Sequence, residues 1–452
     1  MAGRYLRHRR NFRLLLQEDV VPTIGYQECL TWMYGLRRFG IKLELDTIKH
    51  ILKVLGNPHK MYRSIHIAGT NGKGSVAAML STIFHTAGYR VGRYTSPHLE
   101  RFNERICIDN QPIDDEAVLR AYQQVKAINH PFRQPTFFEF TTAMALLEFG
   151  RRKVDWAIIE TGMGGRMDAT NVIQPALTII TNISLEHKQY LGSTIGAIAF
   201  EKAGIIKTEV PLVTGVHQKG AFAIIDQKAA QHKATVLRKG RNFHTRCQGG
   251  NRFSYYGINQ SWRNLQLNLV GAHQVDNAAM VLAACEFLVR SGQVHITESH
   301  IRKGLQRIQW PGRLEIAGVE PHIILDGAHN LMAARVLAKY LMKRFKGMLI
   351  TLVVGILEDK PYRAILKDLA LPCHRIIVTQ PKIERAISAE KLAILARQLC
   401  PNVEVVANVG QAIQHAIETS RTDDVICVAG SLYVVGEAKS ALAGTRDRHP
   451  NI

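Results

Sequence analysis

Residues 69–75 combine glycines, a lysine and a hydroxyl in the order Gly-Thr-Asn-Gly-Lys-Gly-Ser. A short apolar run, residues 64–68, precedes them, and apolar residues at helical spacing follow over 75–87. At such a strand-to-helix turn, backbone N–H groups close on phosphate oxygens and the helix N-terminus adds partial positive charge. Lys73 adds a full charge, and Ser75 offers a hydroxyl to a magnesium ion. The segment therefore predicts a phosphate site.

This segment departs from the standard phosphate-loop string G-x-x-x-x-G-K-S/T. Ile67 stands where the first glycine belongs, and Gly74 separates the lysine from the serine. A chance glycine-rich turn is therefore the alternative. The apolar run before the segment and the helical pattern after it favour phosphate binding.

A second block begins at Glu160, directly after the apolar run 156–159, and continues through several glycines to Asn171. A carboxylate at the carboxyl end of a parallel strand points into the crevice where α/β sheets bind ligands. Glu160 is therefore a candidate for holding a hard cation or its bound water. An ordinary turn, in which an acid precedes glycines, is the alternative.

Two further blocks carry a histidine and a lysine. His187 ends the run 181–187, which follows another apolar pattern, and its neutral imidazole is a candidate metal ligand. A hydrogen-bonded surface histidine is the alternative. Lys202 lies just before Gly204, which indicates the end of a helix. Spacing alone makes Lys202 a helix-terminal cation.

The second half of the chain repeats this arrangement of polar residues at strand ends. Asp326 ends an apolar run, and His329 and Asn330 open a helical pattern, so an acid and a basic nitrogen face the top of a second sheet. Arg313 is a candidate to bind a phosphate through its guanidinium fork, with a surface ion pair as the alternative.

Apolar runs at residues 156–159, 177–181 and 211–214 and a helical pattern at 137–149 predict a parallel sheet with covering helices. Residues 243–269 alternate polar and apolar, which predicts a small antiparallel patch before a helix over 274–289. After Pro311, strand patterns recur near residues 323, 349, 375, 403 and 425. We predict the α/β class: a P-loop-type parallel-sheet ATPase domain with a small antiparallel appendage over 1–308, and a smaller Rossmann-like domain over 309–452.

Composition limits the class of protein. The 452 residues carry 58 Lys and Arg against 37 Asp and Glu, a formal net charge of +21, which favours anionic partners. The longest mainly apolar stretch, residues 348–357, is shorter than the roughly 20 residues of a membrane span. The seven cysteines show no zinc or disulfide spacing, which suits thiols in a reducing cytosol. Residues 1–33 read as a solvated basic extension and lead-in, with an organellar transit peptide as the alternative.

Taken in order, the blocks resemble the folylpolyglutamate synthase and bifunctional dihydrofolate synthase family, a branch of the Mur ligase superfamily of ATP-dependent amide-forming enzymes. The matching blocks are 69–75, 94–99 (Tyr-Thr-Ser-Pro-His-Leu), 101–106 (Arg-Phe-Asn-Glu-Arg-Ile), 160–171, 201–207 and 326–330. The resemblance extends from about Tyr34 to the segment Gly430-Ser431-Leu432-Tyr433. It implies a bifunctional enzyme of the bacterial type.

The resemblance also implies a role for each matching residue at the ATP site. Lys73 holds the ATP phosphates, while Ser75, Glu160 and His187 bind magnesium, with two ions expected. Lys202 falls at the lysine that the family carries as a carbamate, and with Lys73, His187 and Glu160 it completes the expected catalytic set. The nucleotide contacts implied across the domain cleft and along the loop are Gly69, Thr70, Asn71, Gly72, Lys73, Gly74, Ser75, Asn277, Arg313, Asp326 and His329.

On the substrate side, the resemblance implies that Thr136, Phe138 and Asp168 hold dihydropteroate. Ser96 and Pro97 match the family's mobile loop beside the folate. The ATP blocks are shared by enzymes that make dihydrofolate and by enzymes that lengthen the glutamate tail. Asp168 and Phe138 favour an enzyme that does both.

The implied reaction joins L-glutamate to dihydropteroate, to the glutamate tail of reduced folates, or to both, through an acyl phosphate. Mg²⁺, Lys73 and Arg313 are the cations that suit γ-phosphoryl transfer from ATP. One alternative is another ligase of the superfamily, acting on a cell-wall precursor or a γ-glutamyl polymer. The other is a nucleic-acid-binding protein, for which the net charge would be the footprint. We expect a cytoplasmic monomer with small-molecule substrates and with no membrane or nucleic-acid partner.

Overall fold

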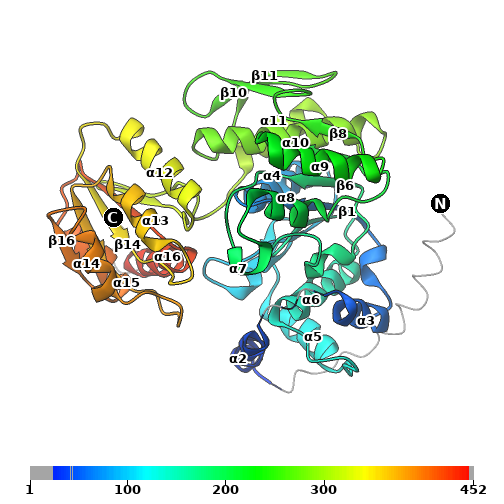
Figure 1. Ribbon diagram of the computed structural model, residues 1–452, viewed down its shortest axis with the longest axis horizontal. Coiled ribbons are helices and arrows are strands. Elements are labelled where there is room, and N and C mark those ends of the chain that lie inside the picture. Colours follow the sequence, from blue (N-terminus) through cyan, green and yellow to red (C-terminus); the bar gives the residue numbers. More distant parts are fainter. Residues whose placement is uncertain (1–23, 41, 43, 447–452) are drawn as a thin grey trace. The chain divides into compact units, whose positions relative to one another are not determined.

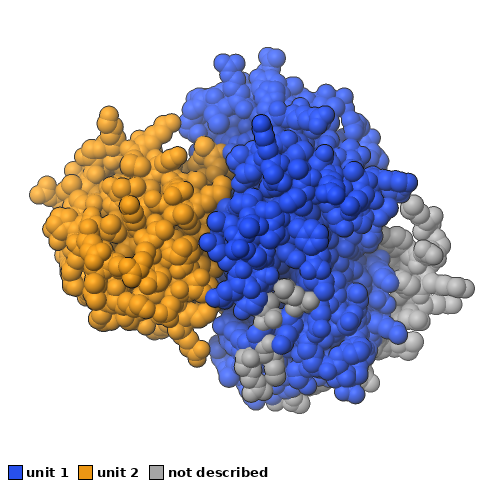
Figure 2. All heavy atoms as spheres, viewed as in Figure 1, with its two compact units in different colours: residues 1–98, 102–268, 274–308 blue, residues 99–101, 269–273, 309–452 orange. Residues whose placement is uncertain are grey.

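The structure is a computed structural model, and it describes residues 24–40, 42 and 44–446. The described chain divides into two compact units (Figure 2). Unit 1 comprises the residues up to 98, 102–268 and 274–308, and unit 2 comprises 99–101, 269–273 and the residues from 309 onward. Most of the predicted basic extension, residues 1–23, lies outside the described residues.

A β-sheet forms the centre of unit 1 (Figure 1). It has eight strands in the order β4-β3-β2-β5-β1-β6-β7-β8. Its strands are β1 (Arg63–Ala68), β2 (Val91–Tyr94), β3 (Ile106–Ile108), β4 (Gln111–Pro112), β5 (Trp156–Glu160), β6 (Leu177–Ile180), β7 (Leu212–Thr214) and β8 (Val236–Arg238). The strands β2, β5, β1, β6, β7 and β8 run parallel to one another. At the edge of the sheet, β3 pairs antiparallel with β2, and β4 pairs antiparallel with β3.

Helices cover both faces of this sheet. On one face, α6 (Phe137–Arg151) packs with Ala157 and Ile159 of β5, and α8 (Ile195–Ala203) and α9 (Lys219–Gln231) pack with Ala68 and Ile180. On the other face, Phe84 of α4 (Lys73–Thr86) meets Trp156 of β5, with 5.2 Å between ring centroids. The remaining helices of unit 1 are α2 (Tyr26–Gly35), α3 (Asp46–Val54), α5 (Asp115–Lys126), α7 (Lys188–Leu191), α10 (Ala272–Arg290) and α11 (Glu298–Arg307), with the short 3₁₀ helices η1 (Leu36–Phe39), η2 (Pro58–Lys60), η3 (Phe102–Arg105) and η4 (Ala169–Val172).

The predicted antiparallel patch is confirmed as a three-stranded sheet of β9 (His244–Cys247), β10 (Arg252–Tyr256) and β11 (Ser261–Gln266). Tyr255 stacks on Trp262 across two strands at 5.2 Å between ring centroids. The Tyr255 hydroxyl donates to the Glu286 carboxylate of α10 over 2.8 Å. This bond attaches the small sheet to the helix that follows it.

Unit 2 contains a six-stranded sheet in the order β12-β13-β17-β14-β15-β16. Its elements are β12 (Glu315–Val319), β13 (His322–Leu325), α12 (Leu331–Arg344), β14 (Ile350–Val354), α13 (Tyr362–Ala370), β15 (Arg375–Val378), α14 (Ala389–Ala396), β16 (Val403–Val405), α15 (Val409–Glu418), β17 (Val425–Ala429) and α16 (Leu432–Arg446). Helices α12 to α14 share one apolar core with the sheet, and α15 and α16 share the other. Of the described strands in this sheet, only β12 pairs antiparallel, so the predicted Rossmann-like α/β class is confirmed.

Every strand that we predicted from an apolar run is present, but β2, β3, β4, β8 and β12 were not predicted. The sequence pattern does not predict β2, because Gly92 and Arg93 interrupt its apolar residues. Gly92 is needed because a side chain there would collide with the ring of Phe149. Among the described helices of both units, none is long and apolar enough to cross a membrane.

The packing of α11 on α4 predicts opposite effects for two glycine-to-alanine changes. A Cβ at Gly304 would lie 2.9 Å from the backbone Cα of Ile83, so Gly304→Ala should lower the free energy of unfolding by about 1–3 kcal/mol. Gly220 lies exposed in α9 with open space around it, so Gly220→Ala should raise that free energy by up to about 1 kcal/mol. Urea unfolding of both variants measures this, and equal shifts in both would contradict the packing argument.

Candidate active site

The loop between β1 and α4 has no room for side chains at two positions. Gly69 has φ 148°, and a Cβ there would overlap the hydroxyl of Thr181. Gly72 has φ 87°, and a Cβ there would overlap the side-chain amide of Asn277 on α10. The predicted nucleotide residue Asn277 therefore lies directly against the predicted phosphate loop. Only glycine permits this close approach together with this backbone conformation.

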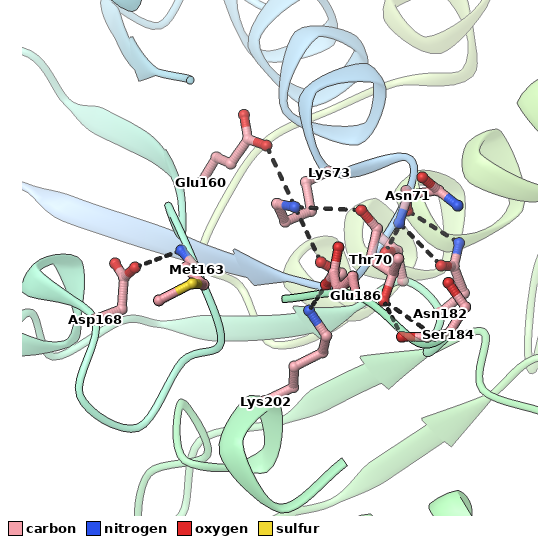
Figure 3. A network of polar contacts seen from close by, with 12 residues as sticks. Thr70, Asn71, Lys73, Glu160, Met163, Asp168, Asn182, Ser184, Glu186 and Lys202 are labelled. Atoms are coloured by element: carbon pink, nitrogen blue, oxygen red, sulfur yellow. Dashed lines mark hydrogen bonds and ion pairs between the residues drawn. The ribbon is translucent and has the colours of Figure 1, made fainter. Parts of the chain in front are cut away.

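The residues after β6 hold this loop in place (Figure 3). The backbone N–H of Asn71 donates to the Asn182 side chain over 3.0 Å, and the Asn182 amide donates back to the Asn71 carbonyl over 2.9 Å. The Thr70 hydroxyl accepts from the backbone N–H of Ser184 over 3.0 Å and donates to its carbonyl over 3.2 Å. Sequence reasoning missed this role, although both segments follow neighbouring parallel strands and therefore had to meet at one sheet edge.

Lys73 and Glu160 come together beside this loop. Lys73 opens α4, and its Nζ donates to the Gly69 carbonyl over 3.0 Å and lies 3.9 Å from Glu160 Oε1. Glu160 is opposite Ile67 in the register of β1 and β5, and it is 5% exposed. The Ser96 backbone N–H donates to Glu160 Oε2 over 3.2 Å, which brings the predicted folate loop to the same carboxylate.

Ser75 and Glu160 supply hard oxygen donors, which suit Mg²⁺. Ser75 is buried in the first turn of α4, whereas His187 is exposed at the start of α7 with φ 44°. Within the described ranges, no three His, Cys, Asp or Glu side chains gather closely enough to hold a metal ion by themselves. Such a site fits Mg²⁺, which usually takes one or two carboxylates together with substrate phosphates and water.

Lys202 lies in the last turn of α8, just before Gly204, as its spacing predicts, but it is only 1% exposed. The sequence therefore predicts the position of Lys202 at a helix end correctly but does not predict that its side chain is buried. Lys202 Nζ lies 2.6 Å from Glu186 Oε1 (Figure 3), a partner that sequence reasoning did not single out. Burial lowers the pKa of Lys202 to about 8, although Glu186 opposes this shift. Burial acts to raise the pKa of Glu186, but Lys202 and Lys73 prevail and lower it to about 2.

The residues predicted to hold the pterin occupy neighbouring elements. The ring of Phe138 lies where a side chain at Gly162 would be, so α6 packs on the glycine-rich loop after β5. Asp168 anchors this loop, because its buried carboxylate accepts from the backbone N–H of Met163 over 2.7 Å. Burial raises the pKa of Asp168, and hydrogen bonds from Thr170 and the loop backbone oppose the shift. Thr136 caps α6, where its hydroxyl oxygen accepts from a backbone N–H.

In unit 2, three predicted residues lie at the carboxyl end of β13. The Asp326 carboxylate is buried and accepts from the backbone N–H groups of Leu314 and Ala328 over 2.8 and 3.0 Å. Burial raises the pKa of Asp326, and Arg313 opposes the shift. The Arg313 guanidinium lies against Gly327, whose carbonyl is 2.8 Å from His329 Nδ1. The structure therefore brings Arg313, Asp326 and His329 together.

Known families and proteins match this chain along most of its length. The family described as Mur ligase middle domain matches residues 67–285, and the Mur ligase glutamate ligase domain matches residues 312–432. The chain is 36% identical to the dihydrofolate synthase/folylpolyglutamate synthase of Bacillus subtilis over 432 residues, which cover 92% of this chain and 99% of that protein. The chain belongs to the dihydrofolate synthase/folylpolyglutamate synthase family. It is an ATP-dependent glutamate ligase of the Mur type.

Solved structures of related enzymes also resemble this ligase along nearly its whole length. The bifunctional folylpolyglutamate synthase/dihydrofolate synthase of Yersinia pestis, complexed with AMPPNP and Mn ion, gives a TM-score of 0.84 at 30% identity and covers 94% of this chain and all of that one. Escherichia coli FolC in complex with DHPP and ADP gives a TM-score of 0.84 at 28% identity, covering 92% and 98% of the two chains.

The buried pair of Lys202 and Glu186 predicts a pH-dependent loss of stability in Glu186→Gln. Removing the carboxylate leaves a buried ammonium without its counter-charge, so the free energy of unfolding at pH 7 should fall by about 3 kcal/mol. The loss should be smaller at pH 9.5, because Lys202 in the folded variant gives up its proton at a lower pH than in the wild type, where its pKa is about 8. Stability therefore rises as the folded lysine sheds its proton.

Chemical denaturation of wild type and Glu186→Gln at pH 7 and pH 9.5, with bicarbonate removed so that Lys202 is a free amine, measures this difference. Exposed Glu298→Gln, which removes a surface partner of Arg302, is the matched control and should change stability by less than about 1 kcal/mol. A Glu186→Gln variant as stable as wild type at pH 7 would contradict the buried pair.

Proposed function

We propose that this ligase joins L-glutamate both to dihydropteroate and to the glutamate tail of reduced folates, using ATP and Mg²⁺. The observation that carries the proposal is the arrangement of Lys73, Glu160 and the Lys202–Glu186 pair around the first turn of α4. The nucleotides, manganese and DHPP in the solved relatives support the same substrates and cofactors. The enzyme is proposed to act as a cytoplasmic monomer, with domains over 1–308 and 309–452.

In the first step, an oxygen of the substrate carboxylate attacks the γ-phosphorus of ATP, and ADP leaves. The backbone N–H groups in the first turn of α4 and the Lys73 ammonium would hold the phosphates, since the first N–H groups of a helix have no acceptor within it. Glu160, Ser75 and His187 would hold two Mg²⁺ ions, which neutralise charge on the transferring group when bound. The product of this step is an acyl phosphate.

In the second step, the α-amine of glutamate attacks the acyl carbon, the C–N bond forms, and inorganic phosphate leaves as the amine loses a proton. The chain contributes placement: holding amine and acyl group together is worth roughly 7–11 kcal/mol of the barrier in well-oriented systems. No covalent bond to a protein nucleophile is needed. Arg313, Asp326, His329 and Asn277 are proposed to bind the nucleotide.

Lys202 is proposed to carry a carbamate. The amine must be neutral to react with carbon dioxide, and the lowered pKa of Lys202 supplies more of the neutral form at pH 7 to 8 than an exposed lysine has. A carbamate would place a second negative charge beside Glu186. It would therefore need a cation next to it, and Lys73 or a magnesium ion would fill that role.

His187 is exposed, unlike Ser75 and Glu160, the other two proposed magnesium ligands. If it binds the metal, His187→Ala should raise the Mg²⁺ concentration for half-maximal activity about tenfold or more while the thermal midpoint stays unchanged. Exposed His217→Ala, on the loop after β7, is the matched control. An unaltered magnesium dependence in His187→Ala would remove this residue from the metal site.

The test of the function itself is phosphate release from ATP with Mg²⁺ and L-glutamate. Separate reactions contain 7,8-dihydropteroate, a reduced folate monoglutamate or a cell-wall precursor as the acceptor. Release with both folate acceptors is the expected result. Release with only one assigns the enzyme to that step, whereas release with the cell-wall precursor alone, or with none, overturns the proposal.

A further inference from the structure

A chain of hydrogen bonds runs from the centre of the sheet to Asp168. His66, in the middle of β1, is completely buried, and its Nε2 lies 2.8 Å from the Thr170 hydroxyl oxygen. The Thr170 hydroxyl in turn lies 2.5 Å from Asp168 Oδ1. Thr170 is also completely buried, so water does not compete for these bonds.

The donor and the acceptor in each of these hydrogen bonds follow from counting protons. A hydroxyl has one hydrogen, so Thr170 donates to the carboxylate and accepts from His66, which must then carry its proton on Nε2. The other ring nitrogen, Nδ1, is buried without a hydrogen-bond partner in the described part of the chain, so a proton there would be unsatisfied. Burial and the nearby Lys207 lower the pKa of His66 to about 3, which keeps the ring neutral.

Asp168 therefore receives donors from two sides. Thr170 contributes its hydroxyl and its backbone N–H, the latter over 3.1 Å, and Met163 contributes its backbone N–H. The charged or titratable groups that face Asp168 from other elements are Lys202 of α8 and Tyr94 of β2. The hydrogen bonds from Thr170 and from the Met163 backbone favour the ionised carboxylate of Asp168, whereas burial alone favours the protonated one.

We propose that His66 and Thr170 are positioning residues that keep Asp168 ionised and oriented as a hydrogen-bond acceptor for the N–H groups of the substrate's heterocycle. This inference rests on the proposed function, in which Asp168 and Phe138 hold the pterin. The ring of Phe138 packs against Gly162 in the loop that Asp168 anchors, so a flat face and an acceptor belong to one site. An ionised carboxylate accepts from ring N–H and amino groups, whereas a protonated one offers them a donor.

Thr170→Val tests the hydroxyl, and Thr170→Ser is the matched variant that keeps it. In Thr170→Val the KM for 7,8-dihydropteroate should rise, and kcat/KM should fall, about tenfold at pH 7.5, since a hydrogen bond to a charged group is lost. The fall should deepen toward pH 6, because Asp168 then takes up its proton at a higher pH. Thr170→Ser should keep the wild-type pH profile, and the KM for ATP should stay unchanged in both variants.

His66→Leu tests the hydrogen bond from His66 to Thr170, and His66→Gln is its matched variant, because glutamine offers an N–H donor where Nε2 lies. His66→Leu removes the Nε2 donor to Thr170 but also the buried Nδ1, which has no partner among the described residues, so the two effects on the thermal midpoint should largely cancel. The KM for dihydropteroate should nevertheless rise as in Thr170→Val, and His66→Gln should restore it. A purely structural role for His66 predicts the opposite pattern.

The possible results separate this inference from the proposed function. A Thr170→Val enzyme with the wild-type pH profile and KM for dihydropteroate would overturn the inference alone. Equal losses of kcat/KM for ATP and for dihydropteroate would also overturn the inference, because they indicate that the variant disrupts the whole site. A wild-type enzyme that neither binds nor uses dihydropteroate would overturn the proposed function, and the inference with it.

Discussion

The close approach of three backbone segments around residues 69–72 is the constraint on which the rest of the site depends. Gly69 touches Thr181 after β6, and Gly72 touches Asn277 of α10, so neither position has room for a methyl group. The reciprocal hydrogen bonds between Asn71 and Asn182 fix the separation of the two strand ends. These contacts fix the position at which α4 begins, and its first residue, Lys73, lies beside Glu160.

Adjacent residues of one strand serve the two faces of the sheet. In the register of β1 with β5, Ile67 is opposite Glu160, whose carboxylate reaches Lys73 on the face that α4 covers. His66, one residue earlier, points to the other face, where it reaches Thr170. A shift of β1 by one residue would exchange these faces and dismantle both networks. The strand therefore sets the phosphate side and the proposed pterin side at once.

Burying charge gives this site its chemistry and its cost. Lys202 and Glu186 are held together in a nearly dry environment, and the free energy of taking both from water is offset only while they stay paired. The same burial lowers the pKa of Lys202 and raises that of Asp168. Burial thus shifts the pKa of each side chain in the direction of its neutral form, and perturbed pKa values of this kind are common in functional sites.

The sequence by itself determined the family, the α/β class and the segments that carry chemistry, because phosphate loops, strand-end acids and apolar periods are local patterns. It also placed Lys202 at a helix end. Only the tertiary structure decided that Lys202 is buried against Glu186, that residues 182–184 hold the phosphate loop, and that His66 reaches Asp168 through Thr170. These facts depend on which strands lie side by side and in what register. Residues more than 100 positions apart meet there, and no local spacing records such a meeting.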